Sequence, residues 1–130
     1  MAVGIAAATL NSWLDALCRS IAYSDPAAFW VKLHTGDPGA AGTSNAAGET
    51  TRKQATFSAA ASAAITTSAD LVWTNVSTAE TYADVSYWDA SSGGTFLGSA
   101  ALAASKTVAV GDTFTITAGD VDLNITPVAA

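Results

Sequence analysis

The chain has 130 residues and a mass of 13.0 kDa, and five basic and eleven acidic residues give a formal net charge of −6. Charged residues make up only 12% of the chain, against a usual share of about 25%. This acidic balance argues against a nucleic-acid partner, because phosphate binding needs clustered Lys and Arg. The length suits a single domain, which we expect to comprise an N-terminal helix over residues 1–25 and a β-sandwich over residues 26–130.

Cysteine content and hydropathy bear on the setting of the protein. Cys18 is the one cysteine, so no internal disulfide forms and stability does not depend on an oxidising compartment. The apolar run at the N-terminus is far shorter than the roughly 20 residues that span a bilayer. We therefore expect a chain made in a cytoplasm with no membrane partner. The mean hydropathy of +0.32 is high, so we expect a partner to cover some apolar surface.

An amphipathic helix is predicted before residue 25. Asp15 and Arg19 are spaced as an i,i+4 ion pair, and Pro26 disfavours helix in the residue before it. Apolar side chains form one stripe on a 3.6-residue period: Leu10, Trp13, Leu14, Leu17, Cys18 and Ile21. Two interpretations stay open. Either the helix packs on its own domain, with Cys18 as a small core residue, or the stripe docks into a neighbouring subunit.

After Pro26 the apolar period changes from 3.6 to 2, which indicates β-strands. The first strand alternates Phe29, Val31 and Leu33 with Trp30, Lys32 and His34. Further strands are predicted over residues 52–57, 71–74, 81–89, 95–102, 106–110, 112–118 and 121–125, and residues 58–67 suggest an edge strand or a bulged connection. Turns are expected at residues 91–94, 111–112 and 119–120, the last closing a hairpin. About eight short strands indicate an antiparallel β-sandwich of immunoglobulin-like or jelly-roll-like type.

A glycine-rich segment, residues 35–50, separates the first two strands. It contains four Gly and no aliphatic residue larger than Ala. Loops of this length inside compact domains are usually functional or mobile. Asp37, Pro38 and the adjacent His34 are therefore candidates for an interface.

The inventory of reactive side chains predicts no enzyme, no cofactor and no metal site. His34 is the only histidine, and we expect it at the surface or beside a turn. With one Cys and one His, no zinc site is filled without carboxylates. The carboxylates are scattered singly, and the glycines of residues 35–50 are not followed by the Lys-Ser/Thr that opens a phosphate-binding helix.

Large aromatic side chains offer the remaining candidate site. Trp30, Tyr82 and Trp88 fall on the strand phase opposite the clearly apolar one. If that phase is exposed, these rings form a platform for a sugar or a protein partner. If both faces of the sheet are covered, they belong to the interior.

Two stretches of the sequence resemble a family of small virion proteins of tailed bacteriophages and prophages. The first runs from Trp30 to Gly39 (WVKLHTGDPG) and is followed by Gly42-Thr43 and Arg52; the second covers residues 86–98 (SYWDASSGGTFLG). The opening helix and the turns at residues 110–113 and 118–120 agree with the same resemblance. Members are commonly labelled tail fibre or minor tail proteins. The resemblance implies a β-sandwich without catalytic residues that forms part of the particle.

We consider two hypotheses for where the protein lies on the phage particle. The absence of length-giving repeats favours a capsid decoration protein or head fibre, docked on capsid subunits or forming a homo-oligomer. The alternative is a minor tail or tail fibre protein that binds a host surface glycan through exposed aromatics. The candidate interface residues are Leu10, Trp13, Leu14, Leu17, Ile21, Trp30, His34, Asp37, Pro38 and Trp88.

Overall fold

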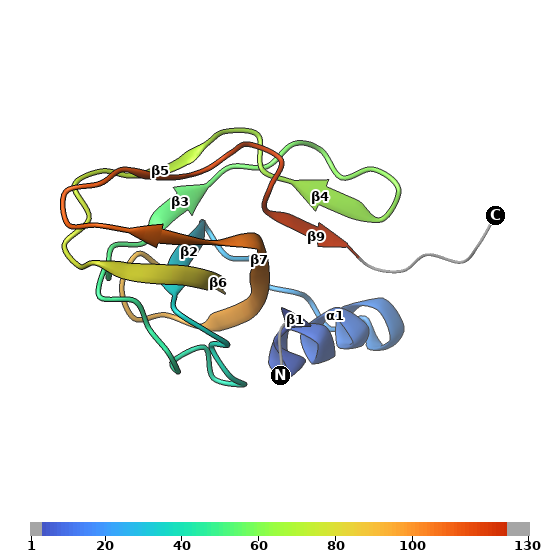
Figure 1. Ribbon diagram of the computed structural model, residues 1–130. Helices are drawn as coiled ribbons and strands as arrows, with labels where there is room; N and C mark the ends of the chain where they lie inside the picture. The colour runs from blue at the N-terminus through green and yellow to red at the C-terminus, as the bar shows by residue number, and fades with distance from the viewer. Residues whose placement is uncertain (1–3, 125–130) are drawn as a thin grey trace.

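The computed structural model describes residues 4–124 and is mainly β, with one helix among these residues (Figure 1). The predicted β-rich class with an N-terminal helix is confirmed. The elements in chain order are β1 (Gly4–Ile5), α1 (Ala7–Arg19), β2 (Phe29–His34), β3 (Lys53–Ala55), β4 (Ala64–Thr66), β5 (Leu71–Trp73), β6 (Glu80–Trp88), β7 (Phe96–Val108), β8 (Phe114–Ile116) and β9 (Asp122–Asn124).

The strands form antiparallel sheets arranged as a β-sandwich. The larger sheet has the order β1-β7-β6-β2-β3, and two short ladders, β4-β9 and β5-β8, complete the arrangement. α1 lies to one side of the sheets, below β4 and β9 in the view of Figure 1. The turn after β6 is confirmed, since Gly93 and Gly94 both have positive φ.

Apolar side chains from the large sheet and from the β5–β8 ladder meet in one core. Trp73, Val76 and Tyr82 are almost fully buried. The ring of Phe114 on β8 lies 5.0 Å from the ring of Tyr82 on β6 and 5.9 Å from that of Trp73 on β5. These tilted ring contacts join the two layers.

A β-bulge explains why Tyr82 is in the core rather than on the outer phase, as its spacing suggested. Tyr82 pairs with Lys106, but Asp84 pairs with Ala101, so β7 carries additional residues between these two pairs. The bulge changes which side chains of β6 face inward. Tyr82 and Val85 are consequently both core residues, although they lie three positions apart. It also makes residues 106–108 the end of β7 instead of a separate strand.

Two further expectations are wrong. The helix ends at Arg19, before Pro26, because Ser20 adopts a left-handed conformation with φ 56° and the Ile21 N–H donates to the Asp15 carbonyl. The strands around residues 119–120 do not form a hairpin, since β8 pairs with β5 and β9 pairs with β4. Ile125, predicted at the end of that hairpin, lies outside the described residues.

Candidate functional site

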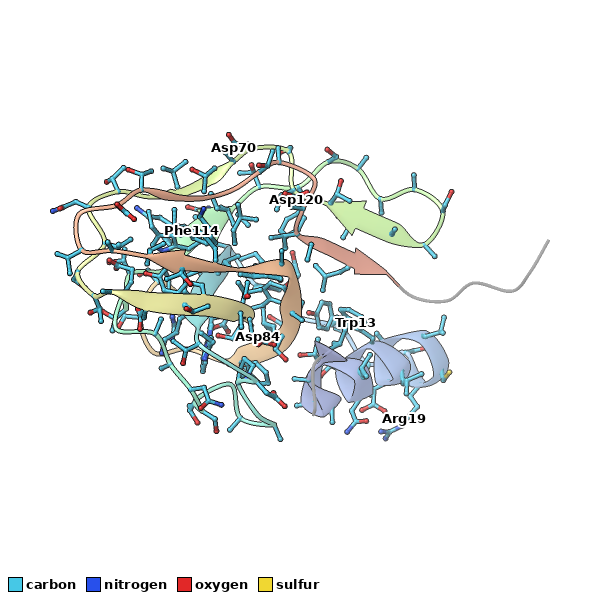
Figure 2. All side chains as sticks on the ribbon, viewed as in Figure 1. Trp13, Arg19, Asp70, Asp84, Phe114 and Asp120 are labelled. Atoms are coloured by element: carbon cyan, nitrogen blue, oxygen red, sulfur yellow. The ribbon has the colours of Figure 1, made fainter. Side chains whose placement is uncertain are left out.

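The side chains of the predicted apolar stripe do not all face the same environment: one faces the strands and the others face solvent. Trp13 is half-buried and points toward the strands, whereas Arg19 points away from them (Figure 2). The remaining members of the stripe are exposed, which corrects the expectation that Cys18 is a core residue. The exposed fractions are 39% for Leu10, 58% for Leu14, 81% for Leu17 and 50% for Ile21. We call these four side chains the leucine face. Leu10, Leu14 and Leu17 recur at spacings of four and three and form one strip on α1. Ile21 follows two residues after the helix ends.

A few contacts hold α1 to the body. β1 pairs with β7, and the Ala6 N–H donates to the Leu97 carbonyl at 2.9 Å. Gly98 permits this approach, because a Cβ there would lie 2.7 Å from the Gly4 carbonyl oxygen. The Trp13 ring meets the Tyr23 ring edge-on at 6.4 Å. Two apolar hollows of about 180 and 250 Å³ border Trp13, so the helix is loosely packed on this side as well.

The face of the large sheet opposite the apolar core is covered by residues 35–50. Cross-strand pairing places Trp30, Lys32 and His34 opposite Trp88, Ser86 and Asp84, so these six side chains share one face. The segment is fixed over it by the hydrogen bond from the Ala47 N–H to the Leu33 carbonyl and by that between His34 Nδ1 and the Ser44 carbonyl. This cover explains why the polar face is inside the molecule.

His34 and Pro38 are therefore not surface residues, contrary to their proposal as interface candidates. Both are almost fully buried, and Asp37 is half-buried. The Asp37 carboxylate accepts a hydrogen bond from the Gly39 N–H at 2.8 Å, and its carbonyl accepts one from the Asn45 side-chain amide. These contacts shape the turn.

His34 is the centre of a satisfied buried network. Its Nδ1 lies 2.8 Å from the Ser44 carbonyl oxygen, and because a carbonyl only accepts, Nδ1 carries the proton. Its Nε2 then accepts from the Ser86 hydroxyl at 2.7 Å, and Ser86 Oγ accepts from the Trp88 indole N–H at 2.7 Å. Burial lowers the pKa of His34, and the positive charge of Lys32 adds to this effect.

The Ser86–His34 pair has the composition of a nucleophile and its base, but not the access that catalysis requires. Ser86 is 0% exposed and its oxygen already accepts the Trp88 N–H. The partner of His34 Nδ1 is a backbone carbonyl rather than a carboxylate. Asp84 lies nearby, and burial, reinforced by Asp37, raises the pKa of its carboxyl. The network therefore joins residues 35–50 to the sheet.

The exposed aromatic platform is not present. Trp88 is only 8% exposed and Tyr82 is 0% exposed, while Trp30 is half-buried. The Arg52 guanidinium lies 4.2 Å from the centroid of the Trp88 ring and donates to the carbonyls of Ala90 and Gly93 at 2.7 Å each. Both faces of the sheet are thus covered at Trp88.

Sequence reasoning did not single out Ser44, Arg52 or Ser86 as structural partners. A usable signal was present: β2 and β6 both alternate polar with apolar residues, and a long segment of small residues follows β2. Together these features are typical of a sheet whose polar face is covered by a loop.

Comparison with known families identifies the chain. The family model described as podophage GP4 fiber I protein gp80 matches residues 4–124. The chain belongs to this family of phage fibre proteins. The suspected relationship to tailed-phage virion proteins is confirmed, and the match covers α1 as well as the sandwich. No curated protein matches the chain. Among the described residues, no helix is long and apolar enough to cross a membrane.

Proposed function

We propose that the chain is a non-enzymatic structural subunit of a phage fibre, displayed on the virion and attached to a neighbouring subunit through the leucine face of α1. The single observation that carries this proposal is the exposure of that face. Four large aliphatic side chains, three of them in one strip on α1, are costly to leave in water, and exposed apolar patches of this kind mark protein interfaces. The description of the family as a fiber protein supports the placement in a fibre.

The attachment includes contacts between copies of this chain. These 130 residues contain no repeats that would form a long shaft, so association of copies is the way in which they contribute length to a fibre. We therefore propose a homo-oligomer that also contacts another virion protein. The subunit is made in the cytoplasm of the bacterial host and needs no cofactor, nucleic acid or membrane.

Capsid decoration is the second candidate. It is favoured by the arrangement of the described residues, a short sandwich with its apolar helix on one side, which suits a subunit docked on a shell (Figure 1). In both cases the leucine face is the docking element.

Immunogold labelling of intact particles with an antibody to this protein tests the proposal. Label confined to the tail or to projecting fibres supports the fibre role. Label spread over the head surface supports capsid decoration instead. Particles that carry no label, although the antibody binds the purified chain, would contradict both candidates.

A further inference from the structure

The β-sandwich is closed along one side and open along the other. On the closed side, β3 of the large sheet lies against β5 of the second layer. On the open side, β8 pairs only with β5 among the described residues, so its second edge forms no ladder. A hollow of about 340 Å³ lies along this edge, with residues 113–116 on one wall and residues 102–106 of β7 on the other. We call the unpaired side of Phe114–Ile116 the β8 edge.

The β8 edge lacks the features that ordinarily protect a free strand. A free edge presents backbone N–H and carbonyl groups that pair readily with another strand, and proteins usually block it with charged residues, proline or a bulge. The three residues of β8 are Phe, Thr and Ile, and β8 pairs with β5 without a bulge. Thr115, at the centre of β8, is exposed. The β8 edge is therefore open to an added strand.

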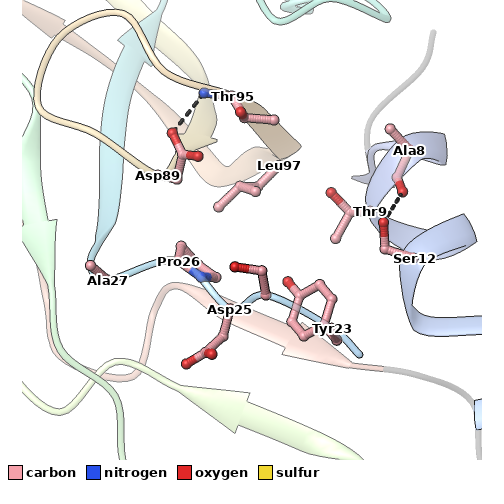
Figure 3. A pocket seen from close by; sticks show the side chains of 11 residues that line it. Ala8, Thr9, Ser12, Tyr23, Asp25, Pro26, Ala27, Asp89, Thr95 and Leu97 are labelled. Carbon is pink, nitrogen blue, oxygen red and sulfur yellow. Dashed lines mark hydrogen bonds between the residues drawn. The ribbon is translucent and has the colours of Figure 1, made fainter. Parts of the chain in front are cut away.

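In the hollow between α1 and the β6–β7 turn, by contrast, polar side chains are bonded within the chain (Figure 3). The Ser12 hydroxyl donates to the Ala8 carbonyl at 3.0 Å. The Asp89 carboxylate accepts a hydrogen bond from the Thr95 N–H at 2.6 Å. These atoms already have partners, whereas the outward backbone groups of the β8 edge have none among the described residues.

Two side chains of opposite charge flank the β8 edge. Lys106 lies near Phe114, because it pairs with Tyr82, whose ring lies 5.0 Å from that of Phe114. Asp120 follows the other end of β8, which is Ile116. Both charged side chains line the hollow, both are exposed, and neither forms an ion pair among the described residues. The two ends of the β8 edge therefore carry opposite charges.

We propose that the β8 edge pairs antiparallel with the β8 edge of a second copy of the chain, around a two-fold axis at Thr115. Antiparallel pairing reverses one copy relative to the other. Lys106 of each copy then comes to the end at which Asp120 of the other copy lies. The charges are complementary at both ends, as a self-complementary two-fold interface requires.

This pairing rests on the homo-oligomer of the proposed function and adds a second contact to it. α1 and the β5–β8 ladder lie on opposite sides of the molecule (Figure 1). A subunit with contacts on two sides is extended in both directions, as a fibre requires. Three residues of strand make a contact well below the roughly 1,000 Å² of a stable interface, so the pairing forms between copies that the leucine face already brings together.

A disulfide at the two-fold axis tests the pairing. In a chain that also carries Cys18→Ser, Thr115→Cys places a thiol directly opposite the same thiol of the second copy, within reach of a disulfide. Oxidation of the assembled protein with diamide should give a covalent dimer on a non-reducing gel. Val72→Cys in the same background is the matched control, because Val72 is 37% exposed and pairs with Thr115 but lies on β5, away from the free edge. It should remain monomeric on the gel.

Exchange of the two charges gives an independent test. Lys106→Asp and Asp120→Lys should each raise the concentration needed for assembly about fivefold to tenfold, since each brings like charges together twice in every pair. The variant that carries both changes keeps the net charge and should assemble as the native chain does. Asp25→Lys is the control, because it makes the same charge change at an exposed position outside the hollow. By making the chain less acidic it should not weaken assembly.

Two results would overturn the pairing alone. One is a native chain that assembles while Thr115→Cys gives no more dimer than Val72→Cys. The other is a double charge variant that assembles no better than either single variant. Crosslinking of Thr115→Cys to a different virion protein would assign the β8 edge to that partner and also overturn the pairing. A native chain that does not self-associate at any concentration would overturn the homo-oligomer of the proposed function together with it.

Discussion

The Nε2 atom of His34 on β2 lies 2.7 Å from the hydroxyl oxygen of Ser86 on β6. Because Ser86 also accepts the Trp88 N–H, its own proton is directed to His34. A protonated His34 would present a second N–H to Ser86 in place of an acceptor. The neutral imidazole is thus the form that the folded protein requires, and this agrees with the lowered pKa of His34.

Stability should consequently fall in mild acid. The folded-state pKa of His34 lies below its ordinary value of 6.5, so the unfolded chain binds the proton first as the pH falls. The contribution of His34 to stability is complete above about pH 6.5 and is lost progressively below it, until the folded-state pKa is reached. Urea denaturation at about pH 8, 7, 6 and 5 measures the free energy of unfolding along this range.

His34→Gln provides the comparison, because glutamine does not titrate. We expect this variant to lose about 1–3 kcal/mol at neutral pH, since a buried network loses a partner. Its free energy of unfolding should change less than that of the native chain between about pH 7 and 5. The pKa of Asp84 is raised mainly by its burial, which both proteins share, while the charge of His34 lowers it and is absent from the variant. Equal pH dependence in the two proteins would show that His34 is not the titrating group.

The sequence was sufficient for the fold class, but not for the covered polar face. Alternation along β2 and β6 correctly separates Val31, Leu33 and Val85 from His34 and Ser86. Alternation shows which residues share a face; it does not show whether that face meets water. That depends on residues 35–50, whose hydrogen bonds to the sheet are mostly made by backbone groups and leave no side-chain pattern.

The sequence also did not show which distant strands pair with each other. β8 and β9 are separated by a short turn, yet each pairs with a strand about 40 or more residues away. The bulge opposite residue 83 also has no local signature. The apolar stripe of α1, in contrast, was evident from its spacing. The spacing did not show that Trp13 faces the strands while the other members face solvent.

Gly42→Ala should destabilise the cover. Gly42 has φ +71°, and a Cβ there would lie 2.3 Å from the Phe96 ring. We expect a loss of about 2–4 kcal/mol in the free energy of unfolding, from left-handed strain and overpacking together. Gly119→Ala is the control, because its φ is +90° but no atom lies within 4 Å of the added Cβ. A similar loss in both variants would mean that the Phe96 contact contributes nothing.

Arg52→Lys should loosen the β6–β7 turn. Lysine keeps the charge but cannot donate from one planar group to the carbonyls of Ala90 and Gly93 while it stacks on Trp88. A loss of about 1–2 kcal/mol is expected in urea denaturation. The exposed ion pair of Arg19 with Asp15 supplies the comparison, since Arg19→Lys should change stability by less than about 0.5 kcal/mol. An unchanged stability of Arg52→Lys would contradict the anchoring role.

Replacing Leu14 and Leu17 together by Gln tests the leucine face directly. Both side chains are more than half exposed, so each substitution should alter the free energy of unfolding by no more than about 0.5 kcal/mol. Attachment depends on burying these side chains, so the double variant should lose self-association in light scattering and co-sedimentation with particles. Val110→Gln is the matched control, because Val110 is 66% exposed but lies far along the chain from α1. If the double variant assembles and co-sediments as the native chain does, the docking element lies elsewhere.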